Sequence, residues 1–175
     1  DGLVVVPAGT SHRYLLPEMS AGIAAVFVDR APGDIVADTV LCANAPGAEA
    51  GVRHLLNHGH RRIAFIGDAP DIFTAAARLE GYRAALSKAG HTVDESLVVM
   101  AQPRLDFVRA ALDRLLDRPD PATALFTSNS RATVAALRAL SDRADRPAIV
   151  GFDDFELADL LSPGVTVVAQ DPSGL

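Results

Sequence analysis

Short apolar runs alternate along this chain with longer segments in which apolar side chains recur every three or four positions. The run Ile63–Gly67 contains no polar side chain, which is typical of a strand covered by helices on both faces. The segment 74–89 that follows carries Leu79, Tyr82 and Leu86 on one helical stripe. Strands that alternate with helices predict a parallel sheet with right-handed crossovers. The predicted fold class is therefore α/β, a parallel sheet flanked by helices.

The same patterns place the individual elements. We expect strands over residues 2–7, 23–29, 39–43, 61–67, 97–100, 122–127, 147–152 and 165–169. We expect helices over residues 11–20, 46–58, 74–89, 105–117 and 130–143, and a short helix over 155–160. Gly59 and Gly90 follow two of these helices, where a helix C-cap commonly needs a left-handed backbone. Cys42, in the strand 39–43, is expected to be a small buried apolar residue.

Composition narrows the function classes. The formal net charge is −6 and lysine and arginine form no run, so the chain lacks the basic surface that neutralises nucleic-acid phosphates. A single cysteine excludes an intramolecular disulfide and a cysteine-based metal site. No apolar run has the length of a transmembrane helix, and no signal peptide is present. Because both ends look like the interior of a domain, we expect the sequence to be part of a longer protein, which gives the missing targeting signals little weight.

Three polar side chains follow the ends of predicted strands, where ligands bind in parallel sheets. Arg78 lies in the first turns of the helix after strand 61–67, Asn129 follows strand 122–127, and Asp153 follows strand 147–152. Arginine donates in a planar fork, aspartate accepts, and asparagine does both, which suits the hydroxyls of a sugar. We expect the three to converge on one rim, with Phe73 offering an apolar face to a sugar ring.

Each of these polar residues also has a purely structural alternative. Arg78 would then pair with Asp71 or Glu80 on the surface. Asn129 and Asp153 would be helix N-caps, the usual role of both residue types at strand-to-helix turns. Spacing alone leaves the ligand-binding and capping interpretations equal.

Other clusters favour no further chemistry. His54, His58 and His60 lie close together without a carboxylate at a metal-binding spacing, which favours surface histidines near a helix C-terminus. The acidic group at 153–159 lacks the spacing of a calcium loop. The sequence contains no phosphate-binding glycine loop, no nucleophile elbow and no zinc-protease motif. We therefore expect no metal, no cofactor and no catalytic activity.

Five segments, taken in order, resemble the LacI/GalR family of bacterial transcription regulators. They are VFVDR at 26–30, HLLNHGHRRIAFIG at 54–67, RLEGYRAAL at 78–86, PATALF at 121–126 and IVGFDD at 149–154. The resemblance covers essentially the whole chain, and the ordered set is more specific than any one segment. It implies a two-lobed core of the periplasmic-binding-protein-like type I fold, one lobe nearly complete and one partial.

The resemblance also implies a domain division and a ligand set. Residues 1–43 would be a partial amino-terminal lobe, residues 44–168 the carboxy-terminal lobe, and residues 169–175 the start of the return crossover to the first lobe. Effector binds between the lobes in this family, and its contacts fall on Arg78, Asn129 and Asp153. Phe73 lies in a loop that varies in the family.

Two positions depart from the family pattern. Ser130 stands where the family usually has aspartate directly after the asparagine, and Ala43-Asn44 stands where it usually has Asp-Asn. Because both departures change polar groups near the implied ligand set, they predict an atypical effector.

The implied function is allosteric sensing of a small-molecule effector, expected to be a carbohydrate, in the cytoplasm and without membrane contact. A homodimer would bind operator DNA only through a helix-turn-helix headpiece absent from this sequence. The first alternative is a periplasmic sugar-binding protein of a transporter, which shares the fold; the basic entry His60-Arg61-Arg62 favours the regulator. The second is an enzyme with a flavodoxin-like sheet, against which the missing nucleophile–base pair argues.

Overall fold

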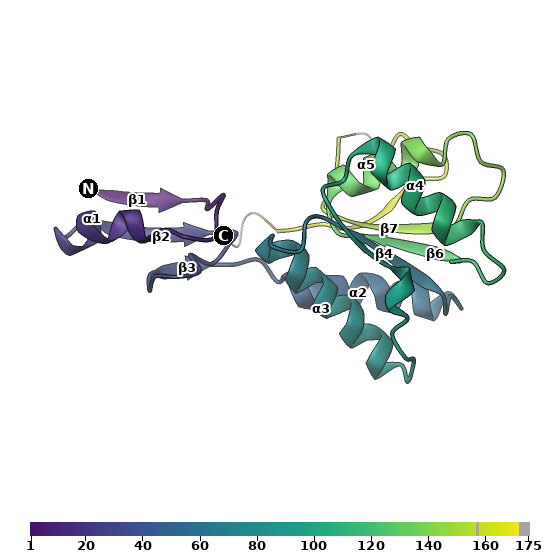
Figure 1. The fold of residues 1–175 in the computed structure, drawn as a ribbon, viewed down its shortest axis with the longest axis horizontal. Coiled ribbons are helices and arrows are strands. Elements are labelled where there is room, and N and C mark those ends of the chain that lie inside the picture. The colour runs from purple at the N-terminus through teal and green to yellow at the C-terminus, as the bar shows by residue number, and fades with distance from the viewer. Residues whose placement is uncertain (157, 172–175) are drawn as a thin grey trace. The chain divides into compact units, whose positions relative to one another are not determined.

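The computed structural model describes residues 1–156 and 158–171 of the chain (Figure 1). The chain divides into two compact units, one formed by Asp1–Ala43 together with Asp171 and the other by Asn44–Gln170. Among the described residues, no helix combines the length and the apolar character needed to cross a membrane.

The first unit is a three-stranded parallel sheet with one short helical connection. Its strands are β1 (Gly2–Val5), β2 (Ala24–Val28) and β3 (Asp38–Val40), in the order β1-β2-β3. The helix predicted over 11–20 is divided into a 3₁₀ turn, η1 (Arg13–Leu15), and α1 (Leu16–Ser20), because Pro17 in the first turn of α1 has no N–H to continue the preceding turn. Phe27 is fully buried at the centre of this unit.

One prediction for this unit is wrong. The third strand ends at Val40 instead of continuing to residue 43. Cys42 therefore lies beyond the strand, and it is half-buried where the sequence predicted a buried core residue.

The second unit is a five-stranded parallel sheet with the strand order β5-β4-β6-β7-β8. Its strands are β4 (Ile63–Gly67), β5 (Val98–Met100), β6 (Ala124–Thr127), β7 (Ala148–Phe152) and β8 (Thr166–Val168). Its helices are α2 (Asn44–Asn57), α3 (Phe73–Lys88), α4 (Leu105–Leu116) and α5 (Ser130–Ala139), with a 3₁₀ turn η2 (Glu95–Leu97) before β5.

Two pairs of helices cover the two faces of this sheet (Figure 1). The α2–α3 pair packs on one face over Phe65 and Phe126, and the α4–α5 pair packs on the other over Ile66 and Leu125. Burial on both faces explains why β4 has no polar side chain. Tyr82 of α3 is fully buried and donates its hydroxyl to the Ile63 carbonyl at 2.8 Å, and its burial raises the pKa of the phenol.

Glycines let α2 approach both α3 and the sheet closely. A Cβ atom on Gly81 would lie 2.2 Å from the carbonyl oxygen of Ala45, so the two helices touch through backbone at this point. A Cβ atom on Gly47 would lie 3.0 Å from the ring of Phe152. The first turn of α2 is thus held against α3 and against the carboxyl end of β7.

Two helix predictions in this unit are wrong in extent. The helix predicted over 130–143 ends at Ala139, where Ser141 donates its hydroxyl back to the Arg138 carbonyl at 3.0 Å and the chain turns. The short helix predicted over 155–160 is wrong for its described residues, 155–156 and 158–160, which lie largely in turns.

Candidate ligand-binding site

Polar residues gather at the carboxyl edge of the five-stranded sheet. Asp68 follows β4, Ser128 and Asn129 follow β6, Asp153 follows β7, and Gln170 comes two residues after β8. The strand order changes direction between β4 and β6, and such a switch point is where ligands bind in open parallel sheets.

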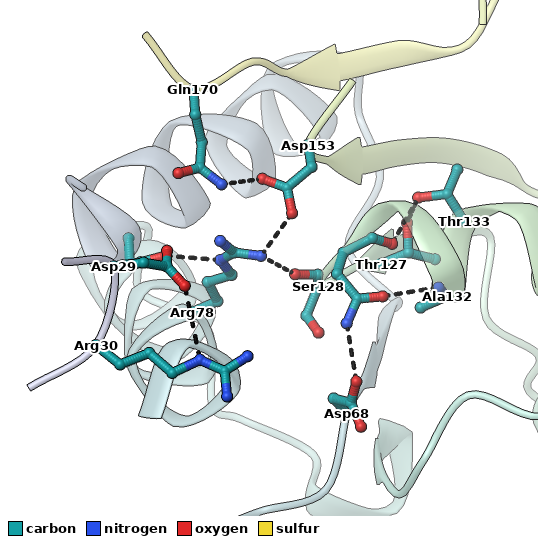
Figure 2. A network of polar contacts seen from close by, with 12 residues as sticks. Asp29, Arg30, Asp68, Arg78, Thr127, Ser128, Ala132, Thr133, Asp153 and Gln170 are labelled. Atoms are coloured by element: carbon teal, nitrogen blue, oxygen red, sulfur yellow. Dashed lines mark hydrogen bonds and ion pairs between the residues drawn. The ribbon is translucent and has the colours of Figure 1, made fainter. Parts of the chain in front are cut away.

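Arg78 of α3 reaches into the centre of this group (Figure 2). The residue is only 3% exposed. Its Nε donates to Asn44 Oδ1 at 2.8 Å, and its Nη1 donates to the Ser128 carbonyl at 2.6 Å and to Asp153 Oδ2 at 3.0 Å. Its guanidinium carbon lies 3.8 Å from the centroid of the Phe152 ring, in cation–π contact. The guanidinium is therefore oriented from several sides at once.

In the ion pair between Arg78 and Asp153, the arginine is buried and the aspartate is partly exposed. The arginine side chain is 4% exposed, whereas the aspartate side chain is 25% exposed. A buried guanidinium needs a compensating charge, and Asp153 supplies it while keeping part of its carboxylate accessible. The surface alternative for Arg78 is wrong, because its partner is this carboxylate and not Asp71 or Glu80.

Asp153 has a left-handed backbone, with φ of 67°. Aspartate adopts this conformation more readily than most residues. Its N–H donates to the Val168 carbonyl at 3.0 Å, and its Oδ1 accepts a hydrogen bond from the side-chain amide of Gln170. The capping alternative is wrong for Asp153, because no helix begins in residues 154–156 or 158–160.

Asn129 does perform the capping role that the alternative interpretation gave it. It is the N-cap of α5, and its Oδ1 accepts from the Ala132 N–H at 2.8 Å. Its Nδ2 donates to Asp68 Oδ2 at 3.1 Å. Because an asparagine amide can make four hydrogen bonds, these two leave capacity for a ligand beside the neighbouring Ser128.

Phe73 is the first residue of α3 and is 38% exposed. The aromatic ring that lies against the guanidinium is that of Phe152, which the sequence reasoning did not single out. It also did not assign a role to Asn44 or to the Ser128 carbonyl. The position of Phe152, directly before Asp153 in a predicted strand, was the available signal, whereas a backbone carbonyl leaves none.

Ser128 contributes a second group to the site. The residue is 1% exposed, and its Oγ has no hydrogen-bond partner among the described residues. The adjacent Thr127, in contrast, pairs its hydroxyl with that of Thr133 at 2.7 Å. A buried hydroxyl left without a partner costs about 1–3 kcal/mol, so such a group is usually satisfied by water or a ligand.

The described residues show no group of three or more histidine, cysteine or acidic side chains that could hold a metal ion. The rings of His54 and His58 lie 4.3 Å apart, and His58 Nδ1 contacts the His54 carbonyl at 2.8 Å. These histidines lie at the C-terminus of α2, where the partial negative charge of the helix end favours them.

The chain matches the model of the periplasmic binding protein-like domain over residues 52–175. It belongs to this family, in the form carried by LacI/GalR-type regulators. The ribose operon repressor of Escherichia coli K12 is 32% identical over 176 residues, which cover 97% of this chain and 53% of the repressor. The chain spans about half the length of the curated relatives it matches.

Solved structures of the same family superpose closely. A regulatory protein of the LacI family from Chloroflexus aggregans gives a TM-score of 0.88 at 26% identity, covering 99% of this chain and 64% of that one. The complex of the transcriptional regulator CelR with cellobiose gives a TM-score of 0.79 at 33% identity, covering 95% of this chain and 53% of that one. The family resemblance and the fold class predicted from the sequence are thus confirmed.

Proposed function

We propose that this chain is the effector-sensing part of a LacI-type transcription regulator and that its effector is a carbohydrate. The observation that supports this proposal is the buried Arg78 guanidinium, paired at 3.0 Å with the partly accessible Asp153 carboxylate. A carboxylate oriented by an arginine is a strong acceptor for sugar hydroxyls.

The neighbouring groups support the same ligand chemistry. Ser128 Oγ offers a hydroxyl that can both donate and accept, and Asn129 keeps part of its hydrogen-bonding capacity. Phe73 offers an exposed apolar ring at the start of α3. The CelR complex holds a disaccharide, and the E. coli relative is named for ribose control, which favours a carbohydrate for this chain too.

The relatives' regulator names favour sensing over transport or catalysis. The two compact units would correspond to a partial amino-terminal lobe at residues 1–43 and a carboxy-terminal lobe at 44–168, with the return crossover at 169–175. In our proposal the regulator acts in the cytoplasm as a homodimer without performing a reaction. It contacts operator DNA through a headpiece that this sequence does not contain. Effector binding shifts the protein between two states by a coupling free energy of about 1–3 kcal/mol.

A sugar panel tests the proposal. Ribose, glucose, galactose and cellobiose would be titrated into the purified chain and into the full-length regulator by calorimetry. Asp153→Asn should weaken binding about tenfold or more, because one charge-assisted acceptor is lost. Arg83→Ala, on the same helix as Arg78, removes an exposed ion pair with Glu95 of η2 and should leave the affinity unchanged. A sugar that binds both variants equally well would place the site elsewhere.

A further inference from the structure

The two residues at which the chain enters and leaves the second unit are both bonded to the same ion pair. The unit begins at Asn44 and ends at Gln170. Asn44 accepts from Arg78. Gln170 donates to Asp153, and Arg78 and Asp153 bond each other (Figure 2). Two residues 126 positions apart in the sequence thus hydrogen-bond to the same guanidinium–carboxylate pair.

The hydrogen bond between Asn44 and Arg78 is short and buried. Asn44 is the first residue of α2 and is 4% exposed. Its Oδ1 lies 2.8 Å from Arg78 Nε, which leaves the Nη atoms of the guanidinium for other partners. Because Gly81 holds α3 against the Ala45 carbonyl one residue further on, the first turn of α2 and the arginine are fixed to each other. A displacement of the guanidinium is therefore felt at the start of α2.

The hydrogen bond between Gln170 and Asp153 holds the C-terminal end of the second unit. Strand β8 is an edge strand, and its last ladder pair joins Val168 to Phe152. Asp153 binds this segment twice, through its N–H to the Val168 carbonyl and through its Oδ1 to the amide of Gln170. The side-chain bond of Gln170 is the outermost of the two, so its strength decides how firmly the end of the unit is held.

We propose that Asn44 and Gln170 are positioning residues that couple the occupancy of the Arg78–Asp153 pair to both points at which the chain passes out of the second unit. This inference rests on the proposed function, since it takes the pair as the effector contact. A ligand hydroxyl that donates to Asp153 Oδ1 competes there with the Gln170 amide, and a ligand oxygen that accepts from Arg78 redistributes the bonds of the guanidinium. Such coupling is reciprocal, so both connections influence effector affinity.

The first test needs no ligand. Hydrogen–deuterium exchange would be measured on the whole chain for peptides covering 41–47 and 166–171. Arg78→Lys, which cannot reproduce the fork geometry, should speed exchange in both peptides by about tenfold. Gln170→Ala should affect only 166–171, and Asn44→Ala only 41–47. Arg83→Lys is the matched control on α3 and should affect neither.

Two further variants separate coupling from a merely structural role. Asn44→Asp keeps an acceptor for Arg78 Nε and should restore slow exchange in 41–47. Asn44→Ala added to Arg78→Lys should produce no further acceleration, because the bond is already lost, whereas an independent capping effect would add. If Arg78→Lys does not fold, as judged by circular dichroism, Gln170→Ala and Asn44→Asp still decide. Unchanged exchange in Gln170→Ala, or additive effects in the double variant, would overturn the proposal.

The second test uses a sugar that binds in the titration panel. Saturating sugar should change exchange in both peptides of the wild-type chain. In Gln170→Ala the response of 166–171 should vanish and the response of 41–47 should persist, while the sugar affinity changes because the amide no longer competes for Asp153 Oδ1. A wild-type response confined to one peptide would refute the coupling while leaving sugar binding intact. Failure of every sugar to bind would count against the proposed function and leave the ligand-free result standing.

Discussion

Replacing Arg78 by methionine should be one of the most destabilising single changes at the polar edge of the second unit. Methionine keeps much of the side chain's length and its packing on Phe152 but removes all the donors. The Ser128 carbonyl and Asn44 Oδ1 then lose donors at 2.6 and 2.8 Å, and the Asp153 carboxylate loses its cation.

The magnitude follows from the burial of each partner. Each buried acceptor left without a donor costs about 1–3 kcal/mol, and breaking a buried ion pair by removing one partner costs about 3–5 kcal/mol. Asp153 is 25% exposed, so water relieves part of its charge and the ion-pair cost lies at the low end. Two acceptors at about 1 kcal/mol each and an ion pair at about 3 kcal/mol lead us to expect that Arg78→Met lowers the free energy of unfolding of the second unit by about 5 kcal/mol.

Urea denaturation followed by tyrosine fluorescence can isolate this unit. The chain has no tryptophan and two tyrosines, Tyr14 in the first unit and Tyr82 buried in the second. A Tyr14→Phe background leaves Tyr82 as the reporter of the second unit. Arg83→Met, which breaks an exposed pair with Glu95, is the control and should cost less than about 1 kcal/mol. Equal effects of Arg78→Met and Arg83→Met would refute the reasoning.

Three further outcomes are expected. Gly81→Ala should destabilise the chain by about 1–3 kcal/mol in the same denaturation assay, because its Cβ would meet the Ala45 carbonyl, whereas Gly9→Ala, with open space around it, should not. Ser128→Ala should leave the melting temperature within a few degrees of wild type but weaken sugar binding in calorimetry, because its hydroxyl has no partner in the unliganded site. Hydrogen bonds from Ser11 and the His12 N–H lower the pKa of Asp34 below its ordinary value. The stability that this carboxylate contributes is therefore present above the ordinary pKa and is lost as the pH falls through the lowered pKa. Asp34→Asn should reduce the fall in melting temperature between about pH 5 and 2 in thermal melts.

Most of the second unit could be predicted from the sequence because its strands are buried on both faces. The apolar run at β4 and the periodic stripe of α3 have few alternative structures, and both elements form within two residues of the expected bounds. The first unit was harder, since its strands are short and Pro17 divides the expected helix. The turns after Phe155 were missed because a helical spacing over six residues is a weak signal without burial to support it.

The site was predicted in part. The pairing of Arg78 with Asp153 follows from the rule that strand ends share an edge. The structure also shows Asn129 as a cap, one of two roles that spacing could not separate. The contacts of Asn44 and of the Ser128 carbonyl depend on how α2 sits against α3 and on a backbone atom, neither of which leaves a pattern in the sequence.

The close seating of Gly47 on Phe152 has an evolutionary consequence. The Phe152 ring packs between the Arg78 guanidinium and the α2 backbone at Gly47. A change of residue size at position 47 or 152 would therefore disturb the hydrophobic core as well as the charged pair. Substitutions that change effector specificity are therefore expected in the loop at 68–72 and at half-buried positions such as Ser130. Related proteins should therefore acquire new effectors by changes at those outer positions, while Gly47, Arg78 and Phe152 stay the same.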